Sequence, residues 1–189
     1  MTKVLAISGS LRRDSYNTDL LRNAVDLLGD DVEVEILDGL KNVPPYDEDD
    51  DREGASEAVQ ALRAAFAGAD GVFISTPEYN SSVPGHLKNA LDWVSRPLAT
   101  NPLRNKPAVV VGASTGTFGA VWAQAELRRV LAAIGARVVE AEVAVGHAPT
   151  RFDEDGTLVD EDLREQLGEV VDALVSAVAE RQELARTAA

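Results

Sequence analysis

Short apolar runs alternate with longer amphipathic segments along the whole chain. Runs rich in β-branched residues predict strands at residues 3–8, 32–37, 71–76, 108–113 and 137–145. Segments with apolar residues at helical spacing predict helices at residues 17–28, 55–67, 85–95, 118–134 and 160–185. Because such alternation requires right-handed crossovers, it predicts a doubly wound α/β fold, with about five parallel strands and helices on both faces of the sheet.

Two acidic segments lack either period. Residues 39–54 contain two adjacent prolines and the acidic run 47–51, and we expect a solvated loop there. Residues 152–159 are acidic and irregular, which predicts an excursion on the surface. No linker, low-complexity tract or internal repeat divides the 189 residues, so a single domain spanning residues 1–189 is expected.

The charge balance excludes several kinds of partner. The chain has 18 basic and 32 acidic residues, a net charge of −14, which disfavours binding to nucleic acid or to an anionic membrane surface. It has no cysteine, so disulfides, thiolate metal sites and a cysteine nucleophile are excluded, and with two histidines we expect no metal site. The apolar runs are far shorter than the ~20 residues of a membrane helix, and no targeting segment is evident, so the expected location is the cytoplasm.

Lysine is scarce among the basic residues, with four in the chain. An acidic, lysine-poor surface is consistent with adaptation to high salt, and equally with ordinary solubilising charge. Both interpretations remain open from the sequence.

Ligands of doubly wound sheets bind beyond the carboxyl ends of the strands, so the loops after residues 8, 76 and 113 are the candidate site. In the first loop, the Ser10 and Ser15 hydroxyls, the Asn17 amide and Arg12 precede a predicted helix and could hold an anion. The loop has neither a Walker A nor a G-x-G-x-x-G pattern, which argues against the usual nucleotide sites. Capping of the helix by Ser15 or Asn17, with solvated arginines, is the alternative.

The other two loops are also unusual for turns. Residues 77–80 place a proline, a glutamate, a tyrosine and an asparagine after a buried strand, which would form a stiff ledge for a flat ring. The alternative is a simple turn before a helix that starts at Pro84. Residues 112–119 contain three glycines and several hydroxyl side chains, so a ligand could approach the backbone closely.

Together, these loops resemble the NAD(P)H-dependent FMN reductase family, which includes chromate, quinone and azo-dye reductases. The motifs are G-S-L-R-x-x-S-x-N at residues 9–17, P-E-Y-N-x-S-x-P-G-x-L-K-N-A-x-D-W at 77–93 and the glycine-rich stretch 112–119. The resemblance covers about residues 4–147. It implies a flavodoxin-like fold, bound FMN, NADPH or NADH as co-substrate, a small-molecule electron acceptor, and a homodimer or homotetramer.

The resemblance also implies roles for individual residues, with FMN rather than a side chain carrying the chemistry. The residues implied to bind the FMN phosphate are Ser10, Arg12, Ser15 and Asn17, with a backbone or ring contact from Tyr16. Those implied to border the flavin ring are Pro77, Glu78, Tyr79 and Asn80. Those implied to form the opposite wall are Ser114, Thr115, Gly116 and Gly119. Phe118 stands where many relatives have a smaller residue, so the resemblance does not define the surroundings of the flavin ring or the access of substrates to it.

Two other functions compete with this interpretation. A nonenzymatic electron carrier of the flavodoxin type would bind FMN in the same fold, and its negative charge would suit a basic redox partner. A serine hydrolase is the second, because residues 112–116 read G-x-S-x-G, with Ser114 as nucleophile and His147 as base. Its acid would have to be Glu126, Glu140 or Glu142, all in predicted helices or strands.

Overall fold

A parallel β-sheet forms the centre of the computed structural model, which describes residues 1–187. The strand order is β2-β1-β3-β4-β5, and β6 also pairs with β4. Every pairing is parallel, as expected for strands joined by helical crossovers. The strands are β1 (Thr2–Ser8), β2 (Val32–Ile36), β3 (Gly71–Ser75), β4 (Pro107–Ala113), β5 (Arg137–Val138) and β6 (Ala144–Val145). The predicted doubly wound, flavodoxin-like sheet is confirmed.

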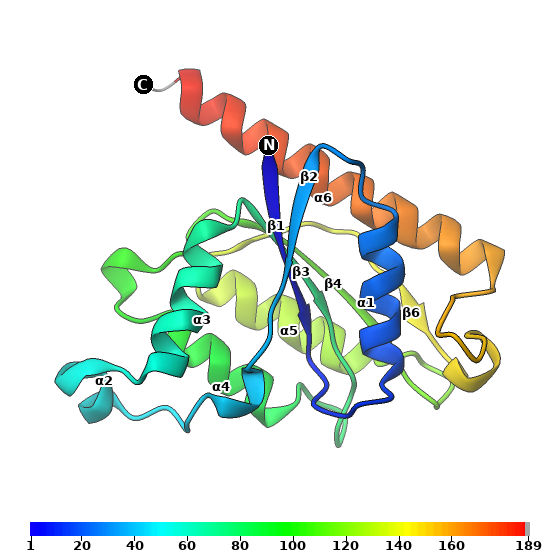
Figure 1. Cartoon of the computed structure of the whole chain (residues 1–189), viewed down its shortest axis with the longest axis horizontal. Coiled ribbons are helices and arrows are strands. Elements are labelled where there is room, and N and C mark those ends of the chain that lie inside the picture. Colours follow the sequence, from blue (N-terminus) through cyan, green and yellow to red (C-terminus); the bar gives the residue numbers. More distant parts are fainter. Residues whose placement is uncertain (188–189) are drawn as a thin grey trace.

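Helices cover both faces of this sheet (Figure 1). One face carries α1 (Tyr16–Asp26) and α6 (Glu161–Thr187). The other carries α3 (Glu57–Gly68), α4 (Gly85–Val94) and α5 (Val121–Ala133). The remaining elements are the helix α2 (Glu48–Gly54) and the short 3-10 helices η1 (Leu40–Asn42), η2 (Leu98–Thr100) and η3 (Ala148–Thr150).

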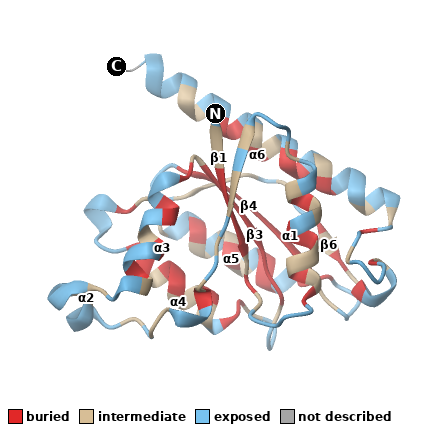
Figure 2. Cartoon of the chain, viewed as in Figure 1, coloured by how far each residue is buried: buried red, intermediate tan, exposed pale blue. Residues whose placement is uncertain are grey.

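The alternation of side chains along each strand builds two hydrophobic layers. In β1, Leu5 and Ile7 pack into the layer under α3, α4 and α5, whereas Val4 and Ala6 pack into the layer under α1 and α6. The central strands are buried along most of their length, as Figure 2 shows. Both layers fix the ends of the strands, and therefore the loops that follow them.

One lysine lies inside this core. Lys106, just before β4, is 2% exposed, and its ammonium donates hydrogen bonds to the carbonyls of Phe66 and Ala69, at the end of α3. Burial, assisted by the nearby charge of Arg181 and opposed by Asp70, lowers the pKa of Lys106 to about 8.

Two sequence expectations are wrong in detail. The segment 39–54 contains η1 and α2 instead of being loop throughout. Helix α2 buries no residue, so it has no apolar period; it is stabilised by the Asp47 cap, by acidic side chains in its first turn and by the Arg52–Glu48 ion pair. The single strand expected at 137–145 is split into β5 and β6, because Ala141 N–H bonds to the Val139 carbonyl at 2.9 Å and turns the chain out of the ladder.

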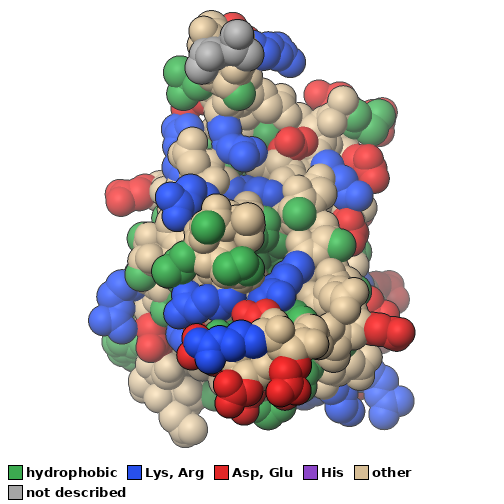
Figure 3. Space-filling model, turned by 90° about the vertical axis from the view of Figure 1, so that its left-hand side faces the viewer, with side chains coloured by type: hydrophobic (Ala, Val, Ile, Leu, Met, Phe, Trp, Pro, Cys, Tyr) green, Lys and Arg blue, Asp and Glu red, His purple; other side chains and the backbone are tan. Residues whose placement is uncertain are grey.

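The charges are unevenly distributed on the surface. Although the chain carries a net charge of −14, Lys and Arg side chains gather on the face shown in Figure 3. Among residues 1–187, no helix combines the length and apolar character needed to cross a membrane.

Candidate functional site

The loops that follow β1, β3 and β4 converge on one groove. The strand order reverses between β1 and β3, and this switch point is where doubly wound sheets bind ligands. The groove is lined by Ser10, Arg12, Ser15, Tyr16, Asn17, Pro77, Glu78, Tyr79, Ala113, Ser114 and Thr115. All the predicted site residues except Asn80, Gly116 and Gly119 are in this lining.

The first loop ends in a capped helix. Ser15 is the N-cap of α1, and its hydroxyl accepts a hydrogen bond from Asn17 N–H at 3.3 Å. The capping alternative is therefore part of the structure, yet the Ser15 hydroxyl proton remains available to a ligand. Among the described residues, the N–H of Tyr16 has no protein acceptor. Helix α1 thus presents a free donor and its positive end to the groove.

Asn17 fixes the start of α1 to the centre of the sheet. Its Oδ1 accepts hydrogen bonds from Ser75 Oγ at 3.1 Å and from Ala113 N–H at 2.9 Å. Its Nδ2 donates to the Ala113 carbonyl at 2.9 Å, and the residue is 3% exposed. Most of the hydrogen-bonding capacity of Asn17 is thus committed to β3 and β4, which leaves one amide proton for a ligand.

The ring of Tyr16 contacts a cation and another ring. The guanidinium of Arg12 lies 5.9 Å from the centroid of Tyr16, and Phe152 stacks on Tyr16 with centroids 5.6 Å apart. Phe152 begins the segment that the sequence predicts to be a surface excursion. Phe152 and Leu158 are instead buried and joined by a β-bridge, so this segment supports the first loop.

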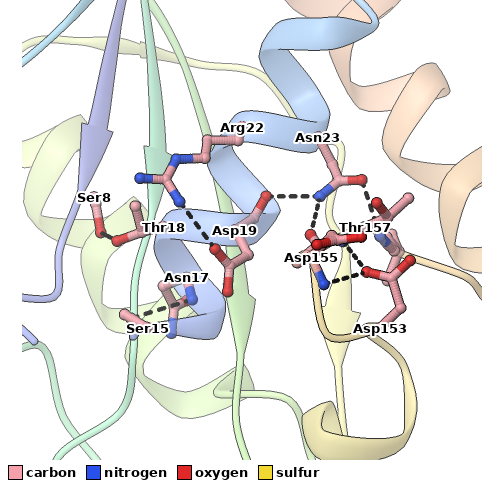
Figure 4. A network of polar contacts seen from close by, with 12 residues as sticks. Ser8, Ser15, Asn17, Thr18, Asp19, Arg22, Asn23, Asp153, Asp155 and Thr157 are labelled. Atoms are coloured by element: carbon pink, nitrogen blue, oxygen red, sulfur yellow. Dashed lines mark hydrogen bonds and ion pairs between the residues drawn. The ribbon is translucent and has the colours of Figure 1, made fainter. Parts of the chain in front are cut away.

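Asn23 attaches that segment to α1 (Figure 4). Its Nδ2 donates to the carbonyls of Asp19 and Gly156 at 2.8 Å, and its Oδ1 accepts from Leu158 N–H at 2.9 Å. Neither Asn23 nor Phe152 was predicted from the sequence to belong to the site. The apolar Phe152 and Leu158 in an otherwise acidic stretch were the signal available.

The second loop is a tight turn. Tyr79 and Ser82 exchange two backbone hydrogen bonds of 3.1 Å, and the intervening Asn80 and Ser81 have φ values of 52° and 60°. These values are those of a type I′ turn, which favours asparagine. The turn leaves Tyr79 48% exposed and directs the loop toward the N-terminus of α5.

Two carboxylates, which we call the clasp, join the second loop to α5. Glu78 accepts hydrogen bonds from the N–H groups of Trp122 and Ala123, both at 3.1 Å, and so caps α5. In return, Glu126 of α5 accepts from Ser82 Oγ at 2.6 Å. It also accepts from the Val83 N–H at 3.3 Å, and these hydrogen bonds lower the pKa of Glu126.

The third loop is closed against β6. Ser114 Oγ accepts a hydrogen bond from Gly116 N–H at 3.1 Å. Gly119 has φ +57°, and a Cβ there would lie 2.4 Å from the Ala144 carbonyl carbon, so a glycine is required for packing. Gly119 therefore faces β6 in this structure and not the groove.

A catalytic triad is not formed around Ser114. Within residues 1–187, no hydrogen bond connects the side chains of Ser114 and His147, and no acidic side chain bonds to His147. Glu126 belongs to the clasp, and Glu142 pairs with Arg128 at 2.8 Å. The geometry does not support the hydrolase alternative.

The fold and the groove define a doubly wound protein with a helix N-terminus and a backbone turn at the switch point. Residues 2–150 match the family of NADPH-dependent FMN reductases, and the chain belongs to that family. It is an FMN-dependent oxidoreductase that uses NAD(P)H and a small-molecule acceptor, as the sequence analysis predicted.

Individual relatives agree with this assignment. The chain is 40% identical to an NAD(P)H-dependent FMN reductase of Pseudomonas aeruginosa over 173 residues, which covers 91% of this chain and 92% of the relative. It is 37% identical to a 2-hydroxy-1,4-benzoquinone reductase of a Burkholderia species over 181 residues, covering 95% and 98%. The structure of FerB, a flavoenzyme NAD(P)H:(acceptor) oxidoreductase from Paracoccus denitrificans, superposes with a TM-score of 0.87 at 34% identity, covering 95% and 98%.

The likeness to electron carriers is limited to the fold. A flavodoxin of Pseudomonas aeruginosa has a TM-score of 0.58 at 18% identity, covering 92% of this chain and 99% of the flavodoxin. The carrier alternative thus shares the architecture, whereas the family and the relatives named above are reductases.

Proposed function

We propose that this enzyme is an NAD(P)H:quinone reductase, with FMN held in the groove formed by the three loops. The observation that carries the proposal is the convergence of Ser10–Asn17, Pro77–Tyr79 and Ser114–Thr115 on one groove at the switch point. A Burkholderia relative and an Escherichia coli relative, 37% and 41% identical, are both named for quinone reduction, which supports the choice of acceptor.

The chemistry of the first loop suits a phosphate group. Two hydroxyls (Ser10, Ser15), one guanidinium (Arg12) and the free N–H of Tyr16 surround one end of the groove, at the positive end of α1. All four can donate hydrogen bonds to phosphate oxygens, and no acidic side chain is in this part of the lining. We assign these groups, with the remaining amide proton of Asn17, to the FMN phosphate.

The size of the groove indicates where the flavin ring would lie. The groove is open to solvent and has a volume of about 160 Å³, which is below the ~300–1,000 Å³ typical of pockets that enclose a whole organic ligand. The groove would therefore hold the phosphate end, and the ring would extend over the exposed ledge. We assign Pro77 to Asn80 to the border of the ring and Ser114, Thr115 and Gly116 to the wall on the other side, whereas Gly119 holds the third loop against β6.

The residues of this chain would bind FMN and orient it. When bound, FMN supplies the redox chemistry, since it can take a hydride from NAD(P)H and pass two electrons to an acceptor. Glu78 would not act as a base, because its carboxylate caps α5. With no cysteine in the chain, and with His86 hydrogen-bonded to the Gly9 carbonyl at 2.9 Å, the protein contributes position and charge instead of an acid or nucleophile.

Spectroscopy and steady-state kinetics test this function. We expect the purified protein to bind FMN, to lose its visible flavin absorbance on anaerobic addition of NADPH or NADH, and to recover it when a quinone is added. Multiple turnovers with a quinone are expected of a reductase, whereas an electron carrier would oxidise NAD(P)H at a negligible rate. Absence of FMN binding would contradict the proposal.

We also propose that the enzyme is a homodimer or homotetramer, as its resemblance to the family implies. Light scattering of the FMN-loaded protein would give the mass directly, and a mass of 20.1 kDa would identify a monomer and reject this part of the proposal.

A further inference from the structure

Three aromatic side chains of the described residues are exposed, and two of them, Phe118 and Trp122, lie against each other. The chain has 2 Trp, 3 Tyr and 4 Phe, and most of them are buried or half-buried. The exposed ones are Tyr79, Phe118 and Trp122, with 48%, 60% and 50% of their surface accessible. The other exposed large apolar residues have no aromatic ring, so the Phe118–Trp122 pair is distinct among them.

Phe118 and Trp122 meet at a wide angle. Their ring centroids are 5.0 Å apart and their planes are inclined by 68°. This arrangement leaves an L-shaped surface, which we call the aromatic corner. A planar ring placed in the corner would stack on one side chain and meet the edge of the other, the two geometries that aromatic rings prefer.

The aromatic corner is fixed beside the groove. Trp122 N–H is hydrogen-bonded to the carboxylate of Glu78, which lines the groove. Phe118 ends the third loop, and its neighbour Gly119 packs tightly against Ala144. The corner is therefore held by backbone contacts, while its two rings remain half exposed or more.

The area of the corner favours a small ligand over a second protein chain. A fully buried aromatic side chain covers ~150–250 Å², so the two side chains of the corner, at about half exposure, offer roughly 200 Å². A stable protein interface needs about 800 Å² from each partner. The corner is thus too small for a subunit interface alone, and its size matches one or two fused rings.

We propose that Phe118 and Trp122 bind the planar ring of the quinone acceptor, and so determine a preference for aromatic over inorganic acceptors. This inference rests on the function proposed above. NAD(P)H provides one hydride, which amounts to two electrons and one proton. The quinone takes a second proton from water and leaves as hydroquinone. The corner forms and breaks no bond, and acts only by holding the ring next to the flavin ledge.

Acceptor kinetics of the FMN-loaded enzyme test the inference. Phe118→Ala and Trp122→Ala should each lower kcat/KM for 2-methyl-1,4-naphthoquinone by about 3- to 10-fold, mainly by raising KM, since one aromatic pair is lost. Reduction of ferricyanide, which has no ring to stack and takes one electron per ion, should change by less than about twofold. Trp122→Phe should restore most of the quinone activity.

Leu184→Ala is the matched control. Leu184 is 65% exposed on α6, outside the groove lining and the corner, so both activities should match the unmodified enzyme. Equal losses for quinone and ferricyanide in the corner variants, or no loss for either, would overturn the inference. A slower anaerobic reduction of FMN by NADPH would also overturn it, because the corner would then bind the nicotinamide.

Comparison of the unmodified protein with the variants distinguishes a failure of the proposed function from a failure of the inference. If the unmodified protein binds no FMN or reduces no quinone, the proposed function fails. If it does both and the variants behave as the control does, the inference alone fails. Light scattering of each variant completes the test, since dissociation into monomers would show that the corner is a contact between copies.

Discussion

Arg12 and Arg13 are adjacent exposed residues that differ in what they face. Arg12 lines the groove and stacks on Tyr16, whereas Arg13 is outside the lining. We expect Arg12→Ala to weaken FMN binding about 10-fold, near the low end for a hydrogen bond to a charged group, because Arg12 is exposed. Fluorescence titration of the apoprotein with FMN measures this.

Arg13→Ala is the matched control for that titration. The substitution removes the same charge from the same loop, and its effect should stay within about twofold, as is usual for exposed charges. If both variants bind FMN with the affinity of the unmodified protein, the assignment of Arg12 to the phosphate is wrong. If both lose affinity equally, long-range charge and not a direct contact is responsible.

The buried Lys106 makes stability depend on pH. Its pKa is lowered to about 8 in the folded chain from 10.5, so the unfolded chain binds more protons between these values. The unfavourable effect on stability is fully present below pH 8 and disappears as the pH rises to 10.5. Relative to Lys106→Met, the free energy of unfolding should therefore rise by about 3 kcal/mol across this range.

Urea unfolding at several pH values measures the effect. The comparison with Lys106→Met removes the contributions of other groups that titrate in the same range. Parallel pH profiles for the two proteins would show that the lysine keeps an ordinary pKa in the folded state.

Residue roles were predictable from the sequence only where the partner is close along the chain. The cap formed by Ser15 follows from its place before a helical period, and the structure contains it. The bonds of Asn17 reach 58 positions to Ser75 and 96 positions to Ala113, and no local pattern indicates such a distance. The sequence therefore located Asn17 at the site without showing how much of its amide is used by the sheet.

At the scale of elements, the clasp joins the second loop to α5. Glu126 accepts hydrogen bonds most strongly as a carboxylate, and its pKa is lowered by the Ser82 and Val83 donors. Its stabilising effect is present above the unfolded pKa and is lost as the pH falls through the lower folded value. We expect Glu126→Gln to be less stable than the unmodified protein at pH 7, with a difference that shrinks in acid.

Unfolding of both proteins by urea at pH 7 and below pH 4 checks this expectation. Glu142→Gln is the control. It also removes a carboxylate, but this one is exposed and pairs with Arg128, not with the second loop. A difference between Glu126→Gln and the unmodified protein that does not change with pH would show that Glu126 acts through its shape and not its charge.

Helices and strands were predicted correctly where burial of one face produces a periodic spacing of apolar residues in the sequence. The central strands and the helices that cover them bury one or both faces, and the sequence shows each of them. Helix α2 buries nothing and was missed, and the break between β5 and β6 was missed because a turn inside an apolar stretch leaves the alternation intact. The groove followed from the fold rule for switch points, whereas the clasp and the aromatic corner needed the tertiary structure.

At the scale of the whole molecule, the net charge of −14 should make stability depend on salt. Potassium chloride shortens the Debye length from ~10 Å at 0.1 M to ~3 Å at 1 M, which screens the repulsion among unpaired acidic groups. We expect the melting temperature at pH 7 to rise by about 3 °C over this range, equivalent to about 1 kcal/mol. Thermal unfolding followed by circular dichroism gives the value.

The same measurement near pH 4.5, the isoelectric point of the sequence, is the control. The net charge is close to zero there, so added chloride should have little effect. A melting temperature that does not respond to salt at pH 7 would reject the interpretation of the acidic surface as an adaptation to high salt.

The two borders of the sheet determine how copies of this chain can and cannot associate. On one side, β2 alternates valine with Glu33 and Glu35, and on the other the border is divided between β5 and β6, each two residues long. A foreign strand could not add to either border over a useful length without meeting repulsion or a gap. Assembly must therefore proceed through helices and loops, and the native protein should not seed fibrils by extending its own sheet.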